Sequence, residues 1–308
     1  MRAETRAPSS RVFVTGVYLR SLWLTLSFVL GCLGYQIVPL LGNDGILPAS
    51  ALLKQVESTV PGPMSNRFFL FPTACWFIGT SDLALHFLSY GGAVLALVAA
   101  IVGGGAGKTL SSAAALMLVS IIVVGGDFCQ FPWDFLLIEA MFIALFYPSA
   151  KPFWESWGAR REPSHAALLA THFLLFRFMW AMGVEKLPIV NGEKAWADMT
   201  FLQRFYETEQ PLPTALSWVL TKMPMGFHKV STLGTWFIEL IVPLWIFGSA
   251  RWQFWSAVLQ AILMLAIQLA GNYATFQVVT VVLMIPLLTD SVFLTAGPAD
   301  GGEGTDAT

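Results

Sequence analysis

The amino-acid sequence predicts an all-α integral membrane protein, a polytopic bundle of about eight transmembrane helices. Of its 308 residues, 56% are hydrophobic and only 12% are charged, whereas soluble domains contain about 25% charged residues. The mean hydropathy of +0.67 describes a surface too apolar for water, so lipid must surround most of it. The 12 Trp and 24 Phe residues are typical of aromatic anchoring at membrane interfaces.

Eight apolar segments are the predicted spans, because a span needs about 20 mostly apolar residues and backbone polar groups in lipid must pair within a helix. They are residues 17–41, 82–103, 109–126, 133–148, 165–183, 230–248, 253–270 and 273–290. The fourth segment is short, and little more than Gly271 and Asn272 separates the last two. A total of seven to nine spans therefore agrees with the sequence.

The predicted transmembrane domain, residues 13–290, lies between an N-terminal segment at 1–12 and a tail at 291–308. The tail is rich in Gly and acidic residues, so we expect it to be disordered. The Lys and Arg residues of the short loops gather on the N-terminal side of the first span, which predicts a cytoplasmic N-terminus and tail. Two long connections, 42–81 and 184–228, then face the extracytoplasmic side, and we expect short interfacial helices in them, including Trp196 to Tyr206 and Pro213 to Lys222.

Several function classes lack their usual signals. The net charge is −2 and no basic stripe interleaved with aromatic residues appears, so nucleic acid is not an expected partner. Cys32, Cys75 and Cys129 have no metal-type spacing, and their odd number excludes a closed disulfide framework. No HExxH or Ser-His-Asp arrangement is present, so we expect neither a metal nor a cofactor. The expected partner is the lipid bilayer.

Charged residues inside predicted spans are informative because they are unfavourable in lipid and usually face the interior of the bundle. Glu139, Arg177 and Glu239 are central to the fourth, fifth and sixth spans, which predicts a buried polar cluster: one ion pair and a second acid that is protonated or paired with Lys186 or Lys229. The cluster could fix the packing of the helices or line a functional cavity. Arg20, near the cytoplasmic edge, is expected to snorkel toward water.

Two further polar residues stand at the ends of spans. Asp134 follows Phe131, Pro132 and Trp133, so it can cap the start of the fourth span. Lys186 directly follows the exit of the fifth span and is next to Glu185. A lysine at a desolvated membrane edge can act as a base, and a lysine beside a glutamate can also simply anchor the end of the helix.

Five blocks of the sequence resemble the signatures of a known family. They are Asp127 and Phe128 followed by QFPWDFLLIEAMF (130–142), LLFRFMWAMGVEKL (174–187), AWADMTFLQRFYETEQPLPT (195–214), FHKVSTLGTWFIELIVPLWIFG (227–248) and GNY (271–273). These blocks are similar to the membrane portion of the lipase maturation factor family. The resemblance runs from about Gly42 to Asp290.

This resemblance implies a chaperone-like protein rather than an enzyme, one that assists folding, assembly or secretion of a client such as a secreted lipase. It implies the endoplasmic reticulum membrane in a eukaryote and the inner membrane in a bacterium. Family members carry a further soluble domain after the spans, which is implicated in client binding. By the resemblance, the positions expected to matter are Trp133, Asp134, Glu139, Arg177, Lys186, Tyr206, Glu207, Gln210, Pro211, His228, Lys229, Glu239, Asn272 and Tyr273.

Two other functions stay open. GVEKL (183–187) more distantly resembles the membrane domain of the vitamin K-dependent gamma-carboxylase, which would make Lys186 a catalytic base, with His228 as a second site residue, acting on a lipophilic substrate. Glu185 stands where that motif has its first lysine. A small-solute or lipid transporter using Arg177, Glu139 and Glu239 is the third hypothesis, although the sequence shows no internal repeat.

Overall fold

The computed structural model describes residues 10–293 and is all-α, with no β-strand among the residues it describes. The predicted fold class is therefore confirmed. Nearly all of the predicted N-terminal segment and of the predicted disordered tail lies outside the described residues, so both stay predictions.

Within residues 10–293, six helices are long and apolar enough to cross a membrane. Four of them are the single helices α1 (Val12–Leu41), α7 (Gly104–Val124), α9 (His165–Glu185) and α15 (Ala250–Ala270). The other two are continuous runs: α5 (Asp82–His86), η1 (Phe87–Gly91) and α6 (Gly92–Val102) form one, and α14 (Met225–Trp236), η4 (Phe237–Ile241) and η5 (Val242–Phe247) form the other. They correspond to six of the eight predicted spans. The helices α1 and α7 begin five residues before the predicted starts at 17 and 109.

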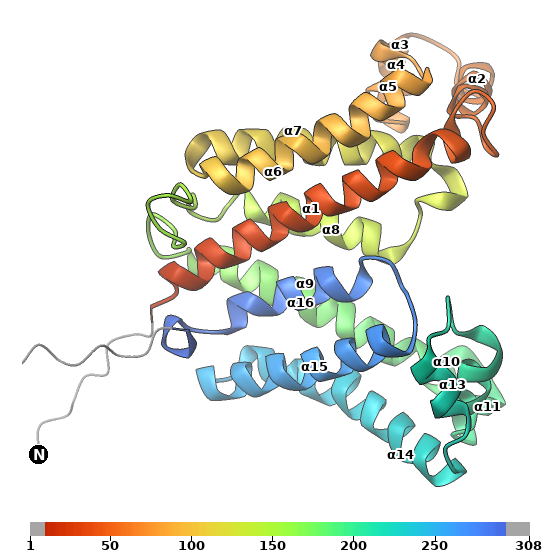
Figure 1. Ribbon diagram of the computed structural model, residues 1–308, viewed down its shortest axis with the longest axis vertical. Helices are drawn as coiled ribbons and strands as arrows, with labels where there is room; N and C mark the ends of the chain where they lie inside the picture. Colours follow the sequence, from red (N-terminus) through yellow and green to blue (C-terminus); the bar gives the residue numbers. More distant parts are fainter. Residues whose placement is uncertain (1–9, 294–308) are drawn as a thin grey trace, which may run out of the picture.

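The other two predicted spans are short helices. The fourth is α8 (Pro132–Ala144), with 13 residues, and the eighth is α16 (Phe276–Met284) with the 3₁₀ turn η6 (Ile285–Leu287). Thirteen helical residues rise only about 20 Å, against about 30 Å of hydrocarbon. Both run along the bundle between its two ends (Figure 1). The number of eight spans stays a prediction.

The two long connections lie at the same end of the bundle, on the right in Figure 1. The first contains α2 (Ala49–Thr59), α3 (Met64–Leu70) and α4 (Cys75–Ile78), and the second contains α10 (Pro188–Asn191), α11 (Lys194–Ala197), α12 (Phe201–Arg204), the π-turn η3 (Phe205–Glu209) and α13 (Ala215–Thr221). The start of α1 and η7 (Asp290–Val292) lie at the opposite end. The helix predicted from Trp196 to Tyr206 is interrupted, because Met199 has a positive φ of 57°.

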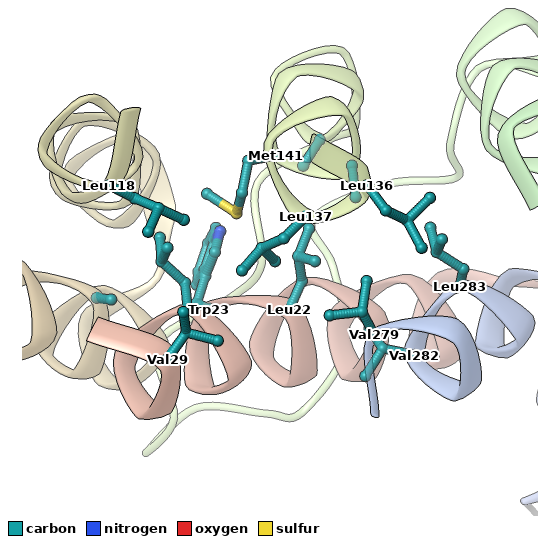
Figure 2. Close-up of a cluster of buried hydrophobic side chains, with 14 of the residues drawn as sticks. Leu22, Trp23, Val29, Leu118, Leu136, Leu137, Met141, Val279, Val282 and Leu283 are labelled. Carbon is teal, nitrogen blue, oxygen red and sulfur yellow. The ribbon is translucent and has the colours of Figure 1, made fainter. Parts of the chain in front are cut away.

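The core is organised around α1, which packs against α6, α8 and α16. Figure 2 shows Leu137 and Met141 of α8 directed at Leu22 and Trp23 of α1. These α1 side chains are fully buried or nearly so. Gly34 of α1 faces the Tyr90 ring, and a Cβ at this glycine would lie 2.6 Å from the nearest ring carbon. The close contact between α1 and the π-turn η1, which contains Tyr90, therefore depends on the absence of a side chain at Gly34.

Arg20 does not snorkel as expected; only 2% of the residue is exposed. Its guanidinium donates to the carbonyl oxygens of Trp157 at 2.6 Å, Ser156 at 3.0 Å and Lys151. It also lies 5.6 Å from the centre of the Trp157 ring. The prediction was wrong because the connection after α8 folds over the start of α1 and supplies the acceptors that water would otherwise provide.

The same end of the bundle is closed by Asp290. Its carboxylate accepts hydrogen bonds from the backbone N–H groups of Phe13 at 3.2 Å and Val14 at 2.9 Å, and from the hydroxyl of Ser10 at 2.6 Å. Asp290 thus caps the N-terminus of α1 from the far end of the described chain. An acidic group at this position also favours the helix dipole.

Candidate functional site

The charged residues of the spans form two separate ion pairs rather than one buried cluster. Arg177 of α9 pairs with Glu139 of α8, and Lys186 pairs with Glu239. Glu239 is buried, with 2% exposure. The side chains of Arg177 and Glu139 are 51% and 40% exposed. The predicted burial of these two residues was wrong, because they lie on the sides of α8 and α9 that face away from the bundle.

The pair of Lys186 and Glu239 joins the end of the fifth predicted span to the middle of the sixth. The Lys186 ammonium lies 2.9 Å from the Glu239 carboxylate and donates to the carbonyl of Met182, also at 2.9 Å. Gly183 makes this approach possible, since a Cβ there would lie 2.9 Å from that of Glu239. The partner of Lys186 is therefore Glu239 and not the adjacent Glu185.

A second group of predicted residues gathers where the 184–228 connection covers the ends of the helices. His228 is fully buried, and neither ring nitrogen has a hydrogen-bond partner among the described residues. Gln210 is 9% exposed, and both polar atoms of its side chain also lack a partner there. The ring of Tyr206 lies 6.1 Å from the His228 ring, and burial raises the pKa of its phenol. Buried polar groups are rarely left unpaired in proteins.

The turn between α15 and α16 completes this group. The N–H of Asn272 donates to the carbonyl of Pro211 at 3.0 Å. A Cβ at Gly271 would lie 2.7 Å from the Gln210 amide carbon and 2.9 Å from the Pro211 carbonyl oxygen, so a side chain there would displace the Gln210 amide and crowd the backbone. Tyr273 lies in the same turn, and burial raises the pKa of its phenol. The structure thus brings together predicted residues from three distant parts of the sequence.

We call the 184–228 connection and the 271–274 turn the platform. The non-glycine residues with positive φ among the described residues are Met199 at 57°, Leu212 at 42° and Ala274 at 54°, and all three lie in the platform. Such conformations are strained, and strain of this kind gathers at functional sites. The platform therefore combines backbone strain with unpaired polar groups.

The remaining predicted residues lie at its edge or near it. Asp134 accepts a hydrogen bond from the N–H of Phe131 at 3.3 Å, so the expected capping contact is present. The Trp133 ring stacks on Phe131 and meets the edge of Phe276, next to the 271–274 turn. The other family-motif positions, Glu207, Pro211 and Lys229, are exposed.

Comparison with known proteins decides the family. The family model of the lipase maturation factor transmembrane domain matches residues 14–295. The chain belongs to the lipase maturation factor family. The resemblance inferred from the sequence is thereby confirmed, and the chain is a multi-pass membrane protein of this family.

Individual relatives of this chain support the same family. Lipase maturation factor 2 of Gallus gallus is 33% identical over 261 residues, which cover 83% of this chain and 35% of that protein. Lipase maturation factor 2 of Homo sapiens is 31% identical over 307 residues, 95% of this chain and 42% of that protein. Lipase maturation factor 1 of Mus musculus is 28% identical over 260 residues, 82% of this chain and 43% of that protein. This lipase maturation factor chain thus spans about two fifths of the length of these relatives, and no solved structure matches it.

Sequence reasoning missed Trp196 of this family member as a site residue. It is 3% exposed, stacks on the Phe201 ring at 4.1 Å and lies 6.2 Å from the Trp236 ring. These contacts attach the platform to α14. A tryptophan in a connection between predicted spans was the available signal, because burial of such a large ring in a loop requires a packing partner.

Proposed function

We propose that this protein holds a folding client, such as a secreted lipase, on its platform at the extracytoplasmic face of the membrane, without catalysing a reaction. The family supports this proposal, because the related proteins are named lipase maturation factors. The proposed location is the endoplasmic reticulum membrane in a eukaryote and the inner membrane in a bacterium, with the N-terminus in the cytoplasm.

The observation that carries the proposal is the apolar surface of the platform. Ile189 is 91% exposed, Leu212 71%, Trp218 66% and Val190 57%, and all four lie in the connection between spans rather than in a span. Incompletely folded proteins expose apolar surface, so a factor that holds them needs a surface of this kind. Exposed apolar patches commonly mark interaction sites or membrane contacts.

The unpaired polar groups buried within the platform support the same function. His228 and Gln210 offer donors and acceptors that the described protein leaves unused. A client backbone segment presents the matching N–H and C=O groups. Because both side chains are buried, a client segment would pair with them only after the covering part of the platform moves, and that pairing would remove an unfavourable free energy from the free protein.

The two alternatives receive less support. A carboxylase would need Lys186 as a free base, and its ammonium is held by Glu239. A transporter would need Arg177, Glu139 and Glu239 around one path, and they belong to two separate pairs, one of which is on the outside of the bundle.

The test measures the maturation of a secreted lipase co-expressed with this chain in cells that lack their own maturation factor. We expect the chain to raise lipase activity per amount of secreted lipase. Replacing Ile189 and Leu212 together by Ser should remove this gain. Phe69→Ser is the matched control, because Phe69 is 86% exposed in the other long connection, at the same end of the bundle. No gain from the unchanged chain, or an equal loss in the control, would contradict the proposal.

A further inference from the structure

The ion pair of Arg177 and Glu139 lies on the outside of the bundle but within the depth of the membrane. Arg177 lies 12 residues after the start of α9 and eight residues before its end, or about 18 Å and about 12 Å at 1.5 Å per residue. Glu139 lies in the middle of α8. Neither position is at a helix end, where a long side chain could reach the polar interface.

Acyl chains cannot satisfy this pair. A guanidinium carries five N–H donors, and Glu139 is the one hydrogen-bond partner of Arg177 within the described part of the chain. Charged residues in transmembrane segments almost always face other protein or a water-filled cavity. The half-exposed pair therefore indicates that something polar covers this face of the bundle.

Both helices show the same pattern around the pair. On α8 it is Phe135, Glu139 and Phe142, and on α9 it is Phe173, Arg177 and Trp180. In both helices the charged residue lies four residues after one aromatic residue and three residues before another. This spacing, i, i+4 and i+7, places the three side chains on one side of the helix. The four aromatic side chains are 44% to 62% exposed. Arginine and aromatic residues are enriched at protein interfaces.

We propose that this face of α8 and α9 binds a second copy of the chain, with a two-fold axis along the membrane normal. The pair forms an electric dipole that points from α8 to its neighbour α9, in the plane of the membrane. A two-fold rotation about the normal reverses that direction, so Arg177 of each copy faces Glu139 of the other. Four alternating charges then close a ring, and each guanidinium gains a second carboxylate. The complement of this face is the face itself, as a two-fold interface requires.

The direction of the helices fixes which aromatic residues meet. Because α8 and α9 run in opposite directions, Phe142 and Phe173 lie on the same side of the ion pair, toward the connection between the two helices. Across the two-fold axis, Phe142 of one copy therefore lies against Phe173 of the other. This contact can be tested by disulfide formation.

The first experiment co-expresses two differently tagged full chains, one with Phe142→Cys and one with Phe173→Cys. Both carry Cys32→Ser, because Cys32 is exposed, whereas Cys75 and Cys129 are buried. Mild oxidation in membranes should produce a disulfide that joins the two tags. The control replaces Phe173→Cys by Leu116→Cys, since Leu116 is 67% exposed on α7 and is absent from the proposed interface. No joined product, or as much product from the control, would overturn the proposal.

The second experiment separates pairing between copies from pairing within one chain. Arg177→Glu gives a copy with two acids on this face, and Glu139→Arg gives a copy with two arginines. Each alone should lose the disulfide, because like charges then face each other across the axis. Co-expression of the two reversed chains should restore it between them, although the pair inside each chain stays broken. Size-exclusion profiles of each variant show whether it is folded, and loss without restoration among folded variants contradicts the interface.

Discussion

The ammonium of Lys186 lies 2.9 Å from the carboxylate of Glu239, and this contact links the platform end of α9 to the π-turn η4 (Phe237–Ile241) within the sixth predicted span. Glu239 is almost completely buried. The pair therefore fixes the position of the platform on the bundle, and its two members should depend on each other.

Glu239→Gln should destabilise the protein, because it leaves the Lys186 ammonium without its counter-ion. Removing one member of a buried pair typically costs about 3–5 kcal/mol. The thermal unfolding midpoint in detergent should fall clearly. In the double variant Lys186→Met with Glu239→Leu no charge is left unpaired, so most of the stability should return. If the double variant is no more stable than Glu239→Gln, the pairing does not explain the loss.

Lys186→Arg should keep lipase maturation close to the level of the unchanged chain. Arginine retains the positive charge and can still pair with Glu239, but it does not lose its proton in proteins. A holding function needs only the pair, whereas a carboxylase needs a base at this position. Abolished activity in a folded Lys186→Arg protein would favour the carboxylase hypothesis.

Arg20→Leu should lower the thermal unfolding midpoint, because the carbonyl oxygens of Lys151, Ser156 and Trp157 lose their donor. Each buried polar group left unpaired costs about 1–3 kcal/mol. Arg160→Leu is the matched control in the same connection, since Arg160 is exposed and surface substitutions usually change stability by less than about 0.5 kcal/mol. Equal midpoints for the two variants would show that the Arg20 contacts add no stability.

The fold was predictable where a single physical requirement decides it. Lipid demands long apolar helices, so the six helices that can cross a membrane match predicted spans. The sequence left the second acid either protonated or paired with Lys186 or Lys229, and the structure pairs Glu239 with Lys186. The alternation of long connections and spans placed both connections at one end of the bundle.

The wrong predictions concern side chains whose burial depends on tertiary packing. The burial of Arg177 and Glu139 depends on which sides of α8 and α9 face the core, and helices rich in apolar residues on all sides do not reveal this. Arg20 depends on a connection more than 130 residues away in the sequence. The family resemblance named Gln210, His228 and Tyr273 as separate positions, and no local pattern in the sequence predicts that residues so distant in the chain lie together.

His228→Phe should keep or raise the thermal stability but reduce lipase maturation. The substitution removes a buried ring whose two nitrogens have no partner among the described residues, and such a group costs about 1–3 kcal/mol. Phenylalanine keeps an aromatic ring against Tyr206 and Phe227. Val230→Ala, at an exposed neighbour, should change neither property. A loss of stability together with activity would mean that His228 has a structural role.

The most direct test of the central claim is photo-crosslinking from the platform to a client. A photoreactive amino acid is placed at Ile189 or Trp218 of the platform, or at Leu116 of α7 as a control in a span, and the chain is co-expressed with a secreted lipase. The account predicts a covalent product with the newly made lipase from both platform positions and none from Leu116. Equal products from all three positions, or none from the platform while the lipase still matures, would contradict it.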